Sequence, residues 1–284
     1  MYCNLCPNNC NTDRNNKKGF CGCDNNVKIA KYYLHPFEEP VISGKNGSGT
    51  VFFCGCSLQC VFCQNYELSR NLRGKTITVS ELADIFRELE KMGANNINLV
   101  NPTHYVDKII SAFNIYKPNI PVVYNSHGYE KIETLSKIDK YVDIYLPDLK
   151  FCSSAVSKRY CGKENYFAVA KESVLFMANK KTEFFDNGIM KSGTIVRHLV
   201  LPQNVADSKN IIDFLATIKD KIYINLMSQY TPFGDIKNFP ELQRKITARE
   251  YNTVLNYAID LGFENMFYQK KESANETYIP NWDY

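Results

Sequence analysis

The chain has 284 residues, 44% of them hydrophobic and 13% aromatic, which excludes intrinsic disorder and allows either two ordinary domains or one α/β barrel. Its 34 basic and 30 acidic residues give a net charge of only +4, and the lysines are scattered, so nucleic acid is not an expected partner. Because no apolar run reaches the roughly 18 residues of a membrane span and the polar N-terminus does not resemble a signal peptide, we expect a cytoplasmic protein with no membrane contact.

The N-terminal segment, residues 1–28, is rich in asparagine and holds five of the 11 cysteines. Such an uneven set in a cytosolic chain indicates metal or redox chemistry rather than a disulfide framework. We therefore predict a small metal-binding segment, followed by a main domain over residues 29–284. Thiolates bind both metals in question, so the sequence leaves open a second iron–sulfur cluster on Cys3, Cys6, Cys10 and Cys21, or a zinc ion on Cys3, Cys6, Cys21 and Cys23. Whether Cys21 or Cys23 is the fourth ligand beside Cys3, Cys6 and Cys10 also stays open.

The stretch after this segment, KIAKYYLHPFEEPVISG, is interpreted as a linker, and its two acidic residues, Glu38 and Glu39, as solvated side chains. Beyond it, strands and helices alternate. Short apolar runs predict buried strands at residues 50–54, 96–100, 121–125, 142–146, 194–201 and 222–227. Segments with a helical period lie between them, at residues 79–92, 103–114, 131–138, 165–179, 207–219 and 247–260.

Strands separated by helices of this length imply a parallel sheet. About six such units, with right-handed crossovers, predict an α/β fold: a partial (β/α)6 TIM-like barrel preceded by the Cys-rich segment. Because the functional residues of parallel barrels stand at the carboxyl ends of the strands, the candidate site residues are those directly after each predicted strand.

The first predicted strand ends in CGCSLQCVFC, where Cys56, Cys60 and Cys63 have the spacing C-x3-C-x2-C. A fully ligated 4Fe-4S cluster takes four cysteines, so three leave one iron open. An open position is what distinguishes a catalytic metal site from a structural one. Cys54 could offer a fourth thiolate, but as a strand residue it is interpreted as an ordinary buried cysteine.

This motif, with Phe62 before its last cysteine and a barrel strand ahead of it, resembles that of the radical S-adenosylmethionine superfamily. The segments NINLVNPTHYV, VVYNSHGYE, VDIYLPDLK and TIVRHLVLP resemble the pyruvate formate-lyase-activating-enzyme-like branch, so the resemblance covers nearly the whole chain. It implies an oxidoreductase in which the open iron binds S-adenosylmethionine. One electron then cleaves that cofactor into methionine and a deoxyadenosyl radical, which abstracts a hydrogen atom from a substrate.

The same resemblance implies partners: an electron donor such as flavodoxin or ferredoxin and, as one candidate, a glycyl radical enzyme that the chain would activate. Two other interpretations stay open. The chain could be a radical enzyme acting directly on a small molecule or a peptide, or a non-catalytic iron–sulfur electron carrier, which would need closed four-cysteine sites.

Polar side chains come after the later strands, and with Phe62 they are the expected contacts to the cofactor: Asn101, Thr103, His104, Asn125, His127, Asp148, Lys150, Gln229 and Tyr230. The family usually carries a Gly-Gly-Glu-type motif after the second strand, which binds the methionyl amino group. This chain lacks it, so Asn101, Thr103 and His104 would have to substitute. These residues also have plainer interpretations. Asn101, which precedes a proline, could cap a helix, the segment NSHG could form a simple turn, and the D-x-K pair could form a surface salt bridge.

The fifth predicted strand places Arg197 and His198 inside an apolar run. A buried arginine needs a partner, and adjacent strand residues face opposite sides, so only one of the two can face the barrel interior. The resemblance implies that Arg197 faces inward and meets the carboxylate of S-adenosylmethionine. His198 is then expected to pack outward against the helices.

Overall fold

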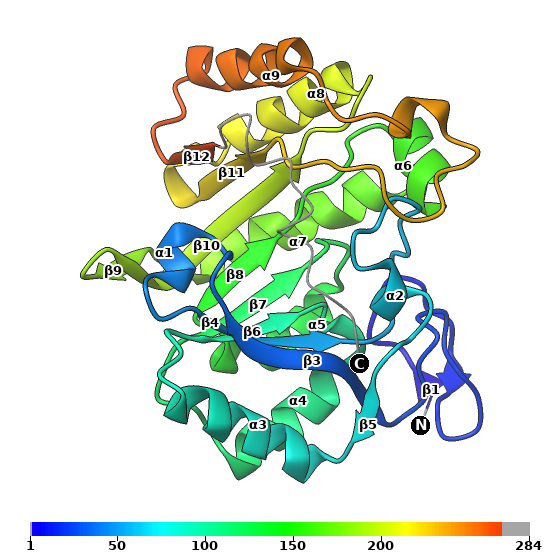
Figure 1. Ribbon diagram of the computed structural model, residues 1–284, viewed down its shortest axis with the longest axis vertical. Helices are drawn as coiled ribbons and strands as arrows, with labels where there is room; N and C mark the ends of the chain where they lie inside the picture. The colour runs from blue at the N-terminus through cyan, green and yellow to red at the C-terminus, as the bar shows by residue number, and fades with distance from the viewer. Residues whose placement is uncertain (1, 269–284) are drawn as a thin grey trace.

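The computed structural model describes residues 2–268 and has the predicted α/β architecture (Figure 1). Six strands lie parallel to one another in the order in which they occur in the chain: β4 (Ser48–Phe53), β6 (Ile97–Val100), β7 (Val122–Ser126), β8 (Ile144–Pro147), β10 (Ile189–Leu199) and β11 (Tyr223–Met227). A short strand, β12 (Met266–Tyr268), continues the parallel sheet beside β11. Within the described residues the order of strands does not close on itself, so the sheet is a partial barrel.

Helices cover the outer side of the curved sheet (Figure 1). Six of them correspond to the predicted helices: α3 (Val79–Lys91), α4 (Val106–Ile115), α5 (Ile132–Ile138), α7 (Tyr166–Lys180), α8 (Val205–Ala216) and α9 (Ala248–Asp260). Each agrees with a predicted helix to within a few residues. Helix α3 begins where it does because Thr78 and Glu81 form a capping box, in which each side chain accepts a hydrogen bond from the other residue's backbone N–H.

Shorter elements connect and flank these units. They are α1 (Pro40–Ser43), α2 (Tyr66–Ser69), α6 (Ser154–Cys161), β1 (Tyr2–Cys3), β2 (Thr12–Asp13), β9 (Phe184–Asp186) and four 3₁₀ turns at Thr103–Tyr105, Asp139–Tyr141, Lys219–Lys221 and Pro240–Leu242, all within the described part of the chain. None of the helices in residues 2–268 is long and apolar enough to cross a membrane.

The linker interpretation is wrong. Residues Val27–His35 form strand β3, which pairs antiparallel with β4 on one side and with β5 (Lys75–Ile77) on the other. Only Val27 and Ile29 of this strand are buried, so its mixture of lysines and tyrosines carries little strand signal. The division between an N-terminal segment and a main domain at residue 28 stays a prediction, and the C-terminal limit at 284 lies outside the described residues.

The interpretation of the two acidic residues after β3 is also wrong, because neither is solvated. Glu39 is 6% exposed, and the amide of Asn225 on β11 donates to both of its carboxylate oxygens, at 2.7 and 2.6 Å. Glu38 accepts hydrogen bonds from Asn98 on β6 and Asn125 on β7. Both carboxylates therefore reach into the barrel interior.

Candidate functional site

A cavity of about 220 Å³ lies at the carboxyl ends of the parallel strands. Its walls come from the loop after β4 and from the ends of β6, β7, β8, β10 and β11. The predicted site residues that line it are Cys56, Cys60, Phe62, Cys63, Asn101, Asn125, His127, Asp148, Lys150, Arg197, Gln229 and Tyr230. The fold thus brings most of the predicted side chains to one place, as the strand-end argument requires.

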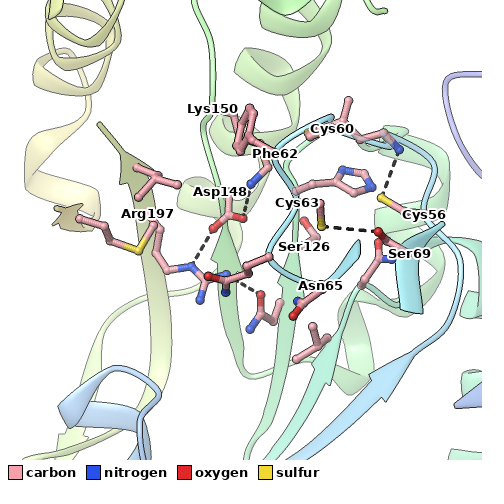
Figure 2. A pocket seen from close by; sticks show the side chains of 18 of the residues that line it. Cys56, Cys60, Phe62, Cys63, Asn65, Ser69, Ser126, Asp148, Lys150 and Arg197 are labelled. Atoms are coloured by element: carbon pink, nitrogen blue, oxygen red, sulfur yellow. Dashed lines mark hydrogen bonds and ion pairs between the residues drawn. The ribbon is translucent and has the colours of Figure 1, made fainter. Parts of the chain in front are cut away.

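Two sulfur atoms of the C-x3-C-x2-C loop, those of Cys56 and Cys63, receive hydrogen bonds from the loop and from the adjoining helix α2 (Figure 2). The backbone N–H groups of Leu58 and Gln59 point to Cys56 Sγ at 3.3 and 3.5 Å, and the Ser69 hydroxyl donates to Cys63 Sγ at 3.5 Å. Donors aimed at sulfur favour the thiolate, which is the form that binds metals. This donor set fits an iron–sulfur cluster.

Without a metal these thiols hold their protons. Burial raises the pKa of Cys56 to about 12, and contact with the Cys161 thiol together with burial raises the pKa of Cys60. Metal binding to such ligands releases protons. Within residues 2–268, no three His, Cys, Asp or Glu side chains converge on one ion position.

Aromatic packing fixes the end of this loop. Phe62 makes edge-to-face contacts with Phe151, Tyr160 and Tyr230, with ring centres 6.0 to 6.1 Å apart. The Tyr230 hydroxyl donates to the carbonyl of Leu242 at 2.7 Å. Phe62 and Tyr230 are therefore packing residues that also form part of the cavity wall.

A charged network crosses the cavity beside the cysteine loop (Figure 2). Arg197 donates from Nε to Asp148 at 2.8 Å, from Nη1 to Glu38 at 2.9 Å and from Nη2 to Asn125 at 2.6 Å. Lys150 donates to the other oxygen of Asp148 at 2.7 Å. Burial alone would raise the pKa of Asp148, but the charges of Arg197 and Lys150 outweigh it and hold that pKa below its usual value.

Of the residues in this network, Glu38 is the one that the sequence analysis does not place in the site. Its position in the chain, 159 residues before Arg197, gives no sign of the contact, because the sequence predicts a linker where β3 lies. The Glu-Glu-Pro run does not mark it either, because the acidic residue directly before the proline at the start of α1 is Glu39.

Arg197 and His198 lie on opposite sides of β10, as the strand pattern predicts. Arg197 lines the cavity. The His198 ring contacts the carbonyl of Leu149 at 2.8 Å and the Ser208 hydroxyl on α8 at 2.9 Å, and burial lowers its pKa to about 4. His198 is a neutral core histidine.

The three residues after β6 that are expected to contact the cofactor lie in different places. Asn101 lines the cavity, but its backbone has φ of 60° and it does not cap a helix, so the capping interpretation is wrong. Asparagine tolerates this left-handed conformation. Its Nδ2 donates to the carbonyl of Gly55, whereas its buried Oδ1 has no partner among the described residues.

Thr103 and His104 do not line the cavity. Thr103 donates to Glu130 at 2.7 Å, and the Nε2 of His104 contacts the carbonyl of Cys54 at 2.7 Å. Both side chains are buried behind the cysteine loop. Here the structure departs from the arrangement that the strand-end argument predicts.

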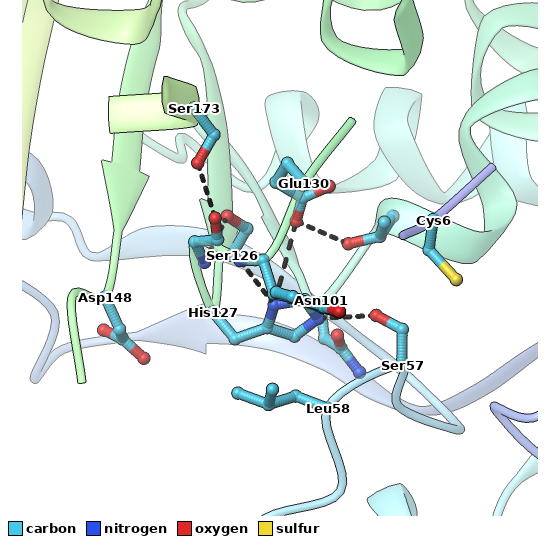
Figure 3. A network of polar contacts seen from close by, with 12 residues as sticks. Cys6, Ser57, Leu58, Asn101, Ser126, His127, Glu130, Asp148 and Ser173 are labelled. Atoms are coloured by element: carbon cyan, nitrogen blue, oxygen red, sulfur yellow. Dashed lines mark hydrogen bonds and ion pairs between the residues drawn. The ribbon is translucent and has the colours of Figure 1, made fainter. Parts of the chain in front are cut away.

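His127 belongs to a second polar network (Figure 3). Its Nδ1 accepts from the backbone N–H of Tyr129 at 3.1 Å, so its Nε2 carries the hydrogen and donates to Ser57, 2.7 Å away. Glu130 lies 4.0 Å from Nδ1. Burial raises the pKa of Glu130 to about 7 and lowers that of His127 to about 3. A neutral His127 thus anchors the residue next to Cys56.

The cysteines of the N-terminal segment lie outside the cavity wall. They are on the other side of the loop, where Cys23 contacts the carbonyl of Cys54 at 3.3 Å. Gln229, in contrast, reaches the cavity from the end of β11.

Comparison with known proteins agrees with this geometry. The family model described as "Radical SAM superfamily" matches residues 50–215. An uncharacterized protein of Methanocaldococcus jannaschii is 31% identical over 269 residues, which cover 90% of this chain and 74% of that protein.

Among solved structures, Streptococcus suis SuiB bound to its precursor peptide SuiA is similar, with a TM-score of 0.52 and 14% identity over 76% of this chain and 46% of SuiB. SuiB bound to S-adenosylmethionine gives a TM-score of 0.50 and 14% identity over 78% of this chain and 47% of SuiB. The chain therefore matches about half the length of SuiB. At this identity the likeness concerns the fold alone.

Proposed function

The chain belongs to the radical S-adenosylmethionine superfamily, and on that premise we propose that Cys56, Cys60 and Cys63 hold its 4Fe-4S cluster and that the adjoining cavity binds S-adenosylmethionine. The observation that carries the proposal is that, of the described cysteines, these three line the cavity. When bound, the cluster supplies the electron that cleaves the cofactor and so starts hydrogen-atom abstraction. The chain's own residues bind and orient the cofactor.

Arg197 and Lys150 are the residues that we assign to the cofactor's carboxylate. The hydrogen bonds of Arg197 use three of its five N–H groups, which leaves one on each terminal nitrogen for a ligand. With Asp148 and Glu38 the network sums to no net charge, so an added carboxylate meets no excess of negative charge. Asp148 holds both cations in position.

Asn101 is our candidate for the amino group. Its Oδ1 is buried and without a partner among the described residues, and a buried acceptor without a partner costs free energy until a donor arrives. An ammonium group supplies that donor. Asn125, His127, Gln229, Tyr230 and Phe62 would complete the wall around the rest of the cofactor.

For the reaction we propose hydrogen-atom abstraction from a polypeptide, with a glycyl radical enzyme as the first candidate substrate. The resemblance of the strand-end segments to the activating-enzyme-like branch supports a protein substrate. A smaller peptide is the second candidate, supported by the fold of SuiB, whose structure holds a precursor peptide. Flavodoxin or ferredoxin would deliver the electron.

The proposal is tested by electron paramagnetic resonance of the anaerobically reduced protein, with and without S-adenosylmethionine. We expect a 4Fe-4S signal that changes when the cofactor is added, because a cluster with an open iron takes a new ligand. The Cys60→Ala variant should give no such signal. A signal that the cofactor leaves unchanged would instead support the electron-carrier interpretation.

The substrate class is tested with deuterated candidates. A radical enzyme that takes its hydrogen atom from a glycyl radical enzyme should transfer deuterium from that protein's glycine into deoxyadenosine. Transfer from a peptide and not from the protein would favour the second candidate.

A further inference from the structure

The N-terminal cysteines lie directly behind the loop that carries the cavity cysteines, and this position suggests a role for them. We propose that Cys3, Cys6, Cys10 and Cys21 form a closed metal centre of four thiolates around a 4Fe-4S cluster, balanced by Arg14, that holds residues 54–59 of the loop in place. The inference rests on the proposed function in one respect: the loop is the one to which we assign the barrel cluster.

The four thiols lie near one another in pairs, although among the described residues no three of them converge on the position of a single ion. A side-chain carbon built on Gly19 would lie 3.5 Å from Cys10 Sγ and 3.6 Å from Cys21 Sγ, so both sulfurs face the same small volume. Cys6 is near enough to Cys21 and Cys3 to feel both thiols electrostatically. The Cys23 thiol contacts the Cys21 thiol and the carbonyl of Cys54. We assign Cys21 as the fourth ligand because its sulfur, and not that of Cys23, lies beside Gly19 together with the sulfur of Cys10.

Arg14 gives an independent indication of a negative centre. The side chain is 7% exposed, and its Nη1 donates to the carbonyl of His104. Its Nε and Nη2 are buried and have no partner among the described residues. The groups around the guanidinium include the thiols of Cys21 and Cys3 and the Tyr105 ring, whose centre is 5.4 Å from the guanidinium carbon.

A buried cation with two unsatisfied donors is costly unless an anion lies beside it. Four thiolates around a 4Fe-4S cluster carry net negative charge and accept hydrogen bonds at sulfur. Beside neutral thiols, the Arg14 guanidinium would keep the His104 carbonyl and the Tyr105 ring but would leave two donors unsatisfied. The metal centre therefore explains both the neighbouring cysteines and the arginine.

The segment also holds the cysteine loop by direct contacts. The backbone N–H of Cys56 donates to the carbonyl of Cys21 at 3.3 Å, and the Cys23 thiol donates to the carbonyl of Cys54 at 3.3 Å. Further along the loop, Asn8 donates to the carbonyl of Ser57 at 2.7 Å. The Gln59 side chain donates back to the carbonyl of Phe20 at 2.8 Å.

Gly55 shows how close this contact is. Its φ is 83°, a conformation that glycine adopts without strain, and a side-chain carbon there would collide with Cys23 Sγ and the carbonyl of Cys21. Because no side chain separates the N-terminal segment from the loop at Gly55, a movement of one displaces the other. Ordering the N-terminal segment around a metal therefore also orders the first half of the cluster loop.

The metal centre is tested first by counting metal and acid-labile sulfide in the full-length protein after anaerobic reconstitution. We expect iron with sulfide beyond what the barrel cluster accounts for, whereas an additional zinc ion in its place would show that the centre is not this four-thiolate cluster. Cys10→Ala and Cys21→Ala should each lose this additional iron, whereas Cys152→Ala, a half-buried cysteine outside the cavity and the segment, should keep it. The inference is overturned if wild-type protein has no additional iron, or if both variants retain it.

Arg14 is tested as a positioning residue in the same protein. Arg14→Gln should lower the affinity for the N-terminal metal by about 10- to 100-fold in a chelator competition, the usual effect of removing a partner of metal ligands. Arg87→Gln, which changes an exposed arginine on α3, is the control and should have no effect. Unchanged affinity in Arg14→Gln would overturn the role of Arg14.

A separate measurement tests whether the N-terminal metal centre keeps the loop in place. Hydrogen exchange of the backbone amides in residues 54–59 should be at least about tenfold faster in Arg14→Gln stripped of its N-terminal metal than in wild type, because their protecting contacts open. Equal exchange would overturn the coupling. Metal counts and exchange do not depend on cofactor cleavage. Failure of the proposed function would appear instead as a barrel cluster that does not respond to S-adenosylmethionine while the N-terminal metal remains.

Discussion

The loop after β4 has two faces with different surroundings. On its cavity face, Cys56, Cys60 and Cys63 open onto charged and polar side chains from five strands. On its other face, the backbone is covered by the N-terminal segment and by His104. The same element is thus exposed to a ligand on one side and fixed on the other.

This difference separates residues that bind from residues that support. A group on the cavity face can change its partners when a ligand arrives, and this is the role that we propose for the two remaining N–H groups of Arg197. A group on the covered face has its partners already, as Thr103 does with Glu130. Changes on the first face should therefore alter cofactor chemistry, and changes on the second should alter stability.

The largest expected effect comes from the cavity thiols. Replacing Cys56, Cys60 or Cys63 by alanine should abolish both the absorbance of the barrel cluster and deoxyadenosine formation, because three thiolates are the minimum set that we assign. Absorption spectra and product chromatography of the reconstituted variants measure this. Cys54→Ala is the control, since the Cys54 thiol points to the carbonyl of Arg73. Loss of the cluster in Cys54→Ala, with retention in one of the three, would show that our ligand set is wrong.

Arg197 should have the next largest effect. Arg197→Ala removes a charge-assisted bond to the cofactor and leaves two buried carboxylates facing it, which should cost about 2–4 kcal/mol of binding free energy. That corresponds to roughly 30- to 1,000-fold weaker binding of S-adenosylmethionine, measured by calorimetric titration. Arg197→Lys should recover only part of it, because an ammonium lacks the planar fork.

His198→Ala is the matched control on the other side of the same strand. It should bind the cofactor nearly normally if it folds, since the His198 ring packs on α8. The opposite pattern, with binding lost in His198→Ala and kept in Arg197→Ala, would contradict the distinction between the two faces of β10.

A substitution of Thr103 tests the covered face of the loop. Thr103→Val removes a hydrogen bond to buried Glu130 and should lower the free energy of unfolding by about 1–3 kcal/mol. Cofactor affinity should stay within about twofold of wild type. Denaturant unfolding and titration of the same preparation measure the two quantities, and a large loss of affinity with unchanged stability would move Thr103 to the binding face.

The smallest expected effect concerns Glu39, whose pKa burial raises from 4.5 to about 7. A raised pKa contributes stability that is present below pH 4.5 and is lost as the pH rises through about 7. Glu39→Gln mimics the neutral acid and can also donate to Asn225 Oδ1, which has no partner among the described residues. It should match wild type near about pH 5 and exceed its stability by about 1–2 kcal/mol near about pH 8. Unfolding curves at both pH values test this. An equal difference in stability between Glu39→Gln and wild type at the two pH values would contradict the raised pKa of Glu39.

Much of this site could be predicted from the sequence because it depends on local patterns. The strand and helix periods locate the strand ends, and the alternation along β10 decides between Arg197 and His198. The cysteine spacing needs no tertiary information. These features are determined within a few residues of where they act.

The features that could not be predicted depend on one backbone angle or on distant chain segments. The left-handed Asn101 redirects the chain, so that Thr103 and His104 go behind the loop although they come after the same strand. Glu38 meets Arg197 only because β3 joins the sheet edge and returns the chain to the barrel interior. No periodicity in the sequence carries either fact.

The most direct test of the central claim is the cleavage reaction itself. Full-length protein, reconstituted anaerobically with iron and sulfide, is mixed with a strong reductant and S-adenosylmethionine, and the products are separated by chromatography. We predict deoxyadenosine and methionine in equal amounts, formed only when both the reductant and an intact cluster are present. A protein that carries a complete, reducible 4Fe-4S cluster in the barrel and yet forms no deoxyadenosine would contradict the account.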